Sequence, residues 1–398
     1  MPVLFKNIAK GLHTRQVEFG LIANETSAIN QLFQRNFPSI KKFFLDRDIE
    51  SQSISDLFCE DDLFVVSFWE PKLILFREIN PKILFWSVFP NTLVNSNLWH
   101  GRFVCHKSNI LLINKLLKGN SLILMDDSPV EKLINYRTKL TGDFVYLPIP
   151  VDVNYNTFLL DEERVKYNKR KVNISYITRF ETWKLFPLVR IICDLVNIRK
   201  CFKVTLNIIT NDIMDVENFL DRNINFDFRS SLQINFLEGI EGDKLNNLLK
   251  QEIDLNIGMG TSCLESAKLG IPTLLINPSY CFIHEDCVYL ELHKTKNFNL
   301  GSFDYINNYN AYISLSQFFE NYLTSASKLQ LLSTKTFDYV NTNHNLNKLI
   351  KRFESFAEIA EIRLSHIEHH VHVYTGYYRF YRMLKRFMFN LIQIRYVF

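Results

Sequence analysis

The chain has 398 residues, of which 47% are hydrophobic and 22% charged, which excludes a disordered protein and allows two folded domains. Its net charge of +4 at pH 7 is too small to favour nucleic acid as a partner. The sequence contains no signal peptide and no run of about 18 apolar residues. These features predict a cytoplasmic protein.

The first half of the chain alternates apolar, strand-like runs with helical ones, a pattern typical of βαβ units. The predicted strands are 17–23, 63–68, 82–88, 121–125 and 144–148, and the predicted helices are 25–35, 71–79, 110–117 and 129–136. Residues 4–13 have a helical pattern, and no strand with a glycine-rich turn precedes them. We therefore expect that the chain is truncated at its start or that its first domain is built without that strand.

The second half repeats the same alternation. The predicted strands are 172–178, 203–210, 232–237, 255–258 and 272–276, and the predicted helices are 185–196, 216–222, 242–250 and 262–269. Two prolines within 146–152 favour an extended hinge. We predict an α/β fold with Rossmann-like domains at 1–148 and 149–345, followed by a helical extension, rich in basic and aromatic residues, at 346–398.

None of the seven cysteines forms a C-x-x-C pair, which predicts reduced thiols in a cytosolic protein. Cys281 and Cys287 are not accompanied by a second pair of ligands, so no metal site is predicted there.

One segment, 253–278, combines several features of a ligand-binding strand, loop and helix. An apolar strand leads into Gly258 and Gly260, and glycines let a ligand approach the backbone. Thr261 or Ser262 is placed to cap the helix that follows, whose first amides and dipole favour a phosphate or a polar sugar group. Glu265 lies one turn inside that helix, where it can accept hydrogen bonds from hydroxyl groups.

This segment resembles the donor-site motif of GT-B glycosyltransferases, particularly the group 1 enzymes of bacterial surface-polysaccharide synthesis. The run 174–184 is similar to a second motif of that family, in which an arginine at a strand end is followed by a lysine. By this resemblance, Arg179 and Lys184 hold the donor diphosphate. Two fixed cations would stabilise the departing nucleotide, so that no metal is needed.

The resemblance implies a fold of two Rossmann-like domains that face a central cleft, with C-terminal helices. Residues 1–148 would lie on the acceptor side and 149–345 would bind the nucleotide sugar. It implies a hexosyltransferase-type enzyme without a cofactor, whose partners are a nucleotide sugar and a polysaccharide or lipid-linked glycan, as in capsule or lipopolysaccharide synthesis. The catalytic residues would be Arg179, Lys184 and Glu265. Gly258, Gly260, Thr261 and Ser262 would complete the donor site.

Three positions depart from the family pattern. Thr178 precedes Arg179 and Leu185 follows Lys184 where relatives have glycine, and Ile257 stands where many relatives have the first of two glutamates. These departures leave open a degenerate, non-catalytic scaffold protein. A UDP-sugar epimerase of the same architecture is a further alternative. Glu70, after the strand 63–68, and His100 are candidates for a general base.

The C-terminal segment carries two further features. His366 and His370 are four residues apart and share a helix face with zinc-binding spacing, but we expect a structural or surface role for this histidine cluster, which includes His369 and His372. From 369 onward no acidic residue occurs, and Arg379, Arg382 and Arg386 lie on one helical side with apolar residues opposite. This pattern predicts either contact of 377–398 with an anionic membrane surface, at the inner face of the plasma membrane, or packing onto the first domain.

Overall fold

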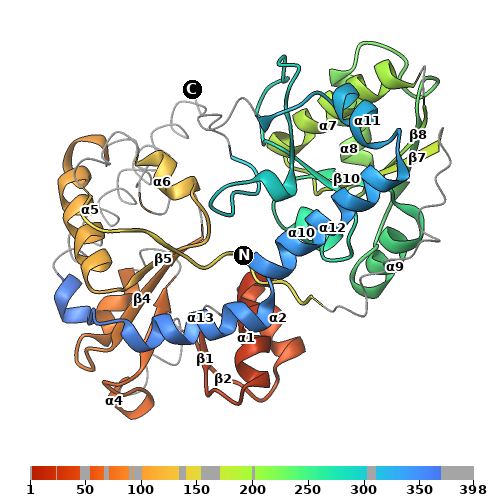
Figure 1. The fold of residues 1–398 in the computed structure, drawn as a ribbon. Helices are drawn as coiled ribbons and strands as arrows, with labels where there is room; N and C mark the ends of the chain where they lie inside the picture. Colours follow the sequence, from red (N-terminus) through yellow and green to blue (C-terminus); the bar gives the residue numbers. More distant parts are fainter. Residues whose placement is uncertain are drawn as a thin grey trace, which may run out of the picture. The chain divides into compact units, whose positions relative to one another are not determined.

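The computed structural model describes residues 2–23, 25–44, 54–66, 71–88, 93, 101–133, 140–153, 171–199, 202–302 and 311–368. The chain divides into two compact units, which are coloured along the sequence in Figure 1. Unit 1 comprises Met1–Pro148 and Asn347–Phe398, and unit 2 comprises Ile149–Leu346. The chain therefore leaves unit 1 once, builds unit 2 and returns.

Unit 1 contains two parallel sheets with helices around them. Its elements are α1 (Pro2–Thr14), β1 (Gly20–Ala23), α2 (Ala28–Asn36), β2 (Lys41–Phe44), α4 (Ile54–Leu57), β3 (Leu63–Val66), the 3-10 helix η1 (Pro71–Phe76), β4 (Lys82–Ser87), α5 (Gly101–Lys118), β5 (Leu122–Leu124), α6 (Ser128–Lys132), β6 (Val145–Tyr146) and α13 (Leu346–Ile359). β1 pairs with β2, and the larger sheet has the order β3-β4-β5-β6.

The segment that follows α13 completes the core of unit 1. Ile362, Leu364 and Ile367 are buried among the apolar side chains of the β3-β4-β5-β6 sheet. The Ile83 amide donates to the Ile362 carbonyl over 2.8 Å. On α13 itself, the ring of Phe353 packs on Trp86, and Glu354 forms an ion pair with Arg15.

Unit 2 is a doubly wound domain. Its elements are β7 (Lys171–Ile177), α7 (Thr182–Ile198), β8 (Lys203–Ile209), α8 (Ile213–Asn223), β9 (Gln233–Leu237), α9 (Gly242–Glu252), β10 (Leu255–Gly258), α10 (Thr261–Ala267), β11 (Thr273–Ile276), β12 (Tyr289–Glu291), the 3-10 helix η4 (Leu292–Lys294), α11 (Leu315–Tyr322) and α12 (Ala326–Asn343).

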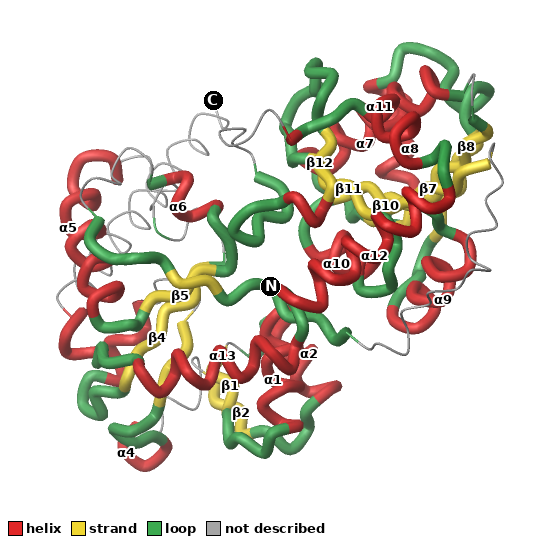
Figure 2. Tube along the Cα trace, in the orientation of Figure 1, coloured by secondary structure: helices red, strands yellow, loops and turns green. Residues whose placement is uncertain are grey.

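The strand order of unit 2 is β12-β11-β10-β7-β8-β9, with only β12 antiparallel to its neighbour. Figures 1 and 2 show α7, α8 and α11 on one side of this sheet and α9, α10 and α12 on the other. The largest apolar core of the described residues lies around it, because β7, β8, β10 and β11 are buried along most of their length.

The predicted strands of both halves are confirmed, most of them to within two residues at each end. Two strands were not predicted: β2, which carries two lysines in four residues, and β12, which has three residues. The predicted helix at 71–79 is wrong in type, since Pro71–Phe76 forms a 3-10 helix. The helix expected at 110–117 begins earlier, at Gly101.

Candidate functional site

The candidate donor site lies where the strand order of unit 2 reverses. β7 and β10 are neighbours in the sheet, although the chain between them has already built β8 and β9 on the far side of β7. In open α/β sheets, ligands bind outside the carboxyl ends of the strands at this switch point. The loop after β7 carries Arg179, and the loop after β10 carries Gly260, so the fold brings the two sequence motifs to one edge.

Lys184 and Arg179 lie close together at this edge. Lys184 is in the first turn of α7, and its amide donates to the carbonyl of Glu181, the residue that precedes the helix. Its pKa is lowered, first by burial of the side chain and then by the positive charge of Arg179. Arg179 is more exposed, and its Nε lies 3.4 Å from the Glu181 carboxylate.

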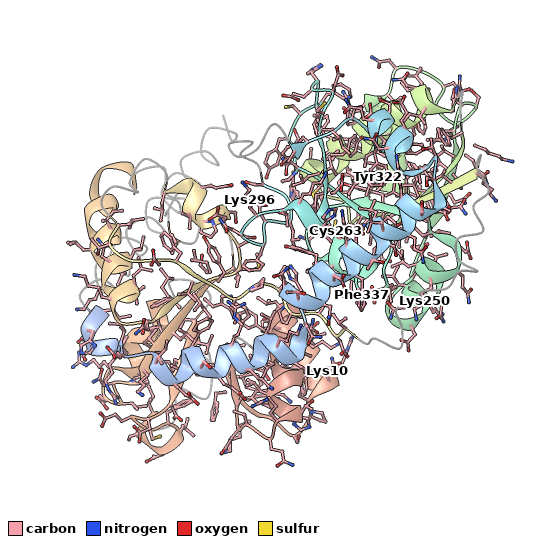
Figure 3. The ribbon with its side chains drawn as sticks, in the orientation of Figure 1. Lys10, Lys250, Cys263, Lys296, Tyr322 and Phe337 are labelled. Atoms are coloured by element: carbon pink, nitrogen blue, oxygen red, sulfur yellow. The ribbon has the colours of Figure 1, made fainter. Side chains whose placement is uncertain are left out.

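Lys184 also lies near the helix of the donor motif. The thiol of Cys263, on α10, is close enough to influence the pKa of Lys184, although the thiol itself is fully buried. Figure 3 labels Cys263 in the interior of unit 2, between the sheet and α12. The hydroxyl of Tyr176, on β7, donates to the Lys184 carbonyl over 2.6 Å and so fixes the start of α7. Lys184 therefore lies at the start of α7, near α10.

The loop 259–260, here called the donor loop, follows directly on Gly258, the last residue of β10. A side chain at Gly258 would place its Cβ 3.2 Å from the Ser262 Oγ and 3.4 Å from the Cys263 Sγ, so the position has little room for one. Gly260 has a φ of +63°, which disfavours other residues. The prediction that Thr261 or Ser262 caps the helix is wrong. Gly260 occupies the cap position, and the Ser262 hydroxyl donates to the Met259 carbonyl.

Glu265 lies on α10, where its half-buried carboxylate pairs with Lys268 one turn further along. The i, i+3 spacing of Glu265 and Lys268 in the sequence is the signal that indicates this pair. The described contacts do not join Glu265 directly to Arg179 or Lys184. Thr261 is exposed at the start of the same helix.

Two of the departures from the family pattern have a structural reason. Ile257 is fully buried in the apolar core of the sheet, so a carboxylate at this position would be desolvated among apolar side chains. Thr178 does not adopt a positive φ, and its amide continues the sheet by donating to the Ile209 carbonyl over 2.9 Å. A threonine is therefore accommodated there without strain.

In unit 1, both general-base candidates, Glu70 and His100, lie outside the described residues. The structure adds Asp126, which follows β5 at the carboxyl edge of the larger sheet. Burial raises the pKa of Asp126 to about 6, although the Ser128 amide and hydroxyl both donate to its Oδ1. A carboxyl with that pKa is suited to proton transfer near neutral pH. The signal for this residue in the sequence is an acidic pair, Asp126 and Asp127, directly after an apolar run.

The histidine cluster and the basic tail are mostly outside the described ranges, since His369, His370, His372 and 377–398 all lie there. His366 is described, and its Nδ1 accepts a hydrogen bond from the Arg363 amide. The described residues contain no group of three or more His, Cys, Asp or Glu side chains arranged to hold a metal ion. In the same part of the chain, no helix has both the length and the apolar character needed to cross a bilayer.

Neither family models nor curated proteins match this sequence. Several solved structures resemble the structure of this chain. A glycosyltransferase from Rickettsia africae is 17% identical with a TM-score of 0.59, covering 90% of this chain and 94% of that one. HepE from Anabaena, solved with UDP and glucose, is 11% identical with a TM-score of 0.51, covering 89% and 94%. An alpha-glucosyltransferase solved with UDP-glucose and DNA is 9% identical with a TM-score of 0.50, covering 89% and 95%.

These likenesses extend over both units. The chain has the GT-B fold of glycosyltransferases, and the predicted fold class is confirmed.

Proposed function

We propose that this chain is a glycosyltransferase that takes its sugar from a nucleotide-diphosphate sugar, with UDP-sugars as the donor class. The observation that carries the proposal is the pair Arg179 and Lys184, which lie close together near α10 at the switch point of unit 2. The structures of HepE with UDP and glucose, and of the alpha-glucosyltransferase with UDP-glucose, support UDP-sugars as the donor class.

In this mechanism, the two cations stabilise the negative charge that grows on the departing diphosphate. A preorganised cation is worth more in a partly desolvated site than in water, and Lys184 is partly buried before any ligand arrives. Arg179 supplies a planar fork that fits two phosphate oxygens. Glu265 would accept hydrogen bonds from donor hydroxyls, while Lys268 balances its charge so that it does not repel the diphosphate.

The proposal is tested by incubating the purified chain with a panel of UDP-sugars and measuring UDP release and sugar transfer. We expect Lys184→Ala and Arg179→Ala each to lower kcat by about 100-fold, because each removes one stabilising charge. The matched control is Arg222→Ala, which removes an exposed cation from α8. Equal activity of all three variants and the wild type would contradict the proposed roles.

A chelator tests the proposal that the two cations make a metal unnecessary. We expect EDTA to leave the activity unchanged. Loss of activity that Mg²⁺ or Mn²⁺ restores would mean that a metal supplies charge that we assign to Arg179 and Lys184.

Our finer proposals concern the acceptor and the location of the protein. We propose hexosyl transfer to a polysaccharide or lipid-linked glycan in the cytoplasm, with 377–398 contacting the anionic inner face of the plasma membrane. Co-sedimentation of the full chain with phosphatidylglycerol vesicles, compared with phosphatidylcholine vesicles, tests this contact. Equal recovery with both vesicle types would argue against it.

A second candidate is a non-catalytic scaffold of the same fold. It is favoured by Ile257, which is fully buried in the apolar core where many relatives have a carboxylate. Calorimetric titration with several nucleotide sugars separates the two candidates, since a scaffold of this kind would bind none of them. Product analysis after incubation with UDP-sugar alone separates both from an epimerase, which would return an isomer of the sugar nucleotide.

A further inference from the structure

The two points where the chain passes between its units, after Pro148 and after Leu346, are tied together just inside unit 2. The Val151 amide donates to the His344 carbonyl over 2.8 Å, and the Leu346 amide donates to the Val151 carbonyl over 2.9 Å. Val151 and Asn345 form a parallel bridge. The segments 149–151 and 344–346, here called the crossing segments, are therefore held side by side by backbone hydrogen bonds.

The side chain of His344 adds a third tie between the crossing segments. The residue is fully buried, and its Nδ1 lies 2.8 Å from the Ile149 carbonyl oxygen. A carbonyl can only accept, so Nδ1 carries the proton and donates. Burial lowers the pKa of His344 to about 4, which keeps the ring neutral at physiological pH. The imidazole is thus a fixed, uncharged part of the link.

The His344 ring also makes an aromatic contact with the loop 295–301, here called the connector loop. The rings of Phe298 and His344 meet edge to face, with centroids 6.1 Å apart and planes at 86°. Phe298 and its neighbour Asn297 both have positive φ angles, +62° and +48°. Two successive left-handed residues without a glycine are unfavourable, and the surrounding contacts must hold them in place.

The connector loop also holds the donor loop. The Leu300 carbonyl accepts a hydrogen bond from the Gly260 amide over 2.7 Å. Gly301 has a φ of +115°, and a Cβ there would lie 3.3 Å from the Met259 Cβ, so the two loops are in close contact. A continuous series of contacts therefore runs from Ile149 through His344, Phe298 and Leu300 to the donor loop.

We propose that His344 is a positioning residue for nucleotide binding: through the ring of Phe298 it sets the conformation of the connector loop and hence of the donor loop. This inference rests on the proposed function, because it assigns a role at the same donor site. It couples donor binding to the crossing segments. The conformation of these segments changes the affinity for the donor, and donor binding shifts the conformational equilibrium of the segments by the same factor.

Two substitutions remove the ring contact in different ways. His344→Asn keeps an amide N–H near the position of Nδ1, where it can still donate to Ile149, but it removes the imidazole ring. Phe298→Leu removes the aromatic ring from the other side. The matched control is Phe318→Leu, the same change at a fully buried phenylalanine of α11, in the core of unit 2.

The first measurement is the Kd of UDP by calorimetric titration of the full chain. We expect His344→Asn and Phe298→Leu each to raise Kd about tenfold, and Phe318→Leu to leave it within about twofold. The double variant should be no worse than the more affected single one, because both changes break the same contact. Binding by both single variants within twofold of the wild type would overturn the inference.

The second measurement needs no ligand and separates the inference from the proposed function. Hydrogen exchange reports the Gly260 amide, whose acceptor is the Leu300 carbonyl. We expect faster exchange of this amide in His344→Asn and Phe298→Leu but not in Phe318→Leu. If the wild type binds no UDP or UDP-sugar, the proposed function fails, and exchange alone decides the inference. Unchanged exchange in both variants would overturn the link itself.

Discussion

The hydroxyl of Ser175, on β7, donates a hydrogen bond to the Oδ1 of Asn256, on β10, over 2.9 Å. Both residues are fully buried and lie opposite each other in the sheet. The bond joins the two strands whose ends carry Arg179 and the donor loop. It is part of a row of polar side chains that cross the sheet in register: Asn235, Asn207, Ser175 and Asn256.

Ser175→Ala should lower the free energy of unfolding of unit 2 by about 1–3 kcal/mol, because it leaves a buried amide oxygen without its donor. Urea denaturation measures this loss. The control is Ser230→Ala at an exposed position, for which we expect a change within about 0.5 kcal/mol. Equal stability of the two variants would show that the bond is not needed to join the strands.

Donor affinity should fall at alkaline pH through Lys184. Burial and the charge of Arg179 lower the pKa of Lys184 in the free chain, and a bound diphosphate would raise it again. As pH rises through the lowered pKa, the free lysine loses its proton and part of the attraction is lost. Titration with UDP across that range measures the effect.

The same titration on Lys184→Ala gives the control. We expect weaker binding at all pH values and a much smaller alkaline decline, since the titrating group is gone. An alkaline decline of unchanged size in this variant would assign the effect to another residue.

His344 should make the stability of unit 2 sensitive to mild acid. Its pKa falls from an ordinary 6.5 to about 4 in the folded chain. Below pH 6.5 the unfolded chain gains a proton that the folded chain does not, so stability is lost as pH falls towards 4. Between pH 7.5 and 5 this loss is on the order of 2 kcal/mol.

The measurement compares urea denaturation of the wild type and His344→Gln at both pH values. We expect the wild type to be more stable than His344→Gln at pH 7.5, and this difference to be smaller by about 2 kcal/mol at pH 5, because only the wild type has the titrating ring. Asp126 acts in the opposite direction in unit 1, since its raised pKa favours the folded state in acid. Comparison with the variant removes that contribution. A difference that stays constant with pH would contradict the buried, neutral state of His344.

Gly119→Ala should destabilise unit 1. A Cβ at position 119 would lie 2.5 Å from the Cγ1 of Ile362, which is buried where the C-terminal segment joins the core. Overpacking of this kind costs about 1–3 kcal/mol. The double variant with Ile362→Ala should lose less stability than the sum of the two single losses, because Ile362→Ala removes the atoms that the added Cβ would meet. Stability of the double variant equal to the sum of two independent losses would contradict the clash.

The fold was largely predictable because buried parallel strands are continuous apolar runs. β7, β8 and β10 are of this kind, and their prediction is confirmed. β2 was missed because the first two of its four residues are lysines, which leaves an apolar run of only two residues. The helix at 71–79 was wrong in type because periodicity alone does not separate an α-helix from a short 3-10 helix.

For the site, the family resemblance indicated Arg179, Lys184 and the helix α10, and the fold places these two cations near α10. Their roles in binding and catalysis stay predictions. The prediction of Thr261 or Ser262 as the cap was wrong because Gly260, with a positive φ, occupies the cap position in place of a hydroxyl residue. The contact of Phe298 with His344 joins residues far apart in sequence, and no local pattern indicates such a contact.

The return of the chain to unit 1 has a consequence for synthesis on the ribosome. Unit 2 is continuous, so it can fold once residue 346 has emerged. Unit 1 lacks Ile362, Leu364 and Ile367 until the chain beyond unit 2 has been made, and these side chains fill its core. The first unit to be translated is therefore the last to be completed, and its incomplete apolar surface stays exposed while unit 2 is made.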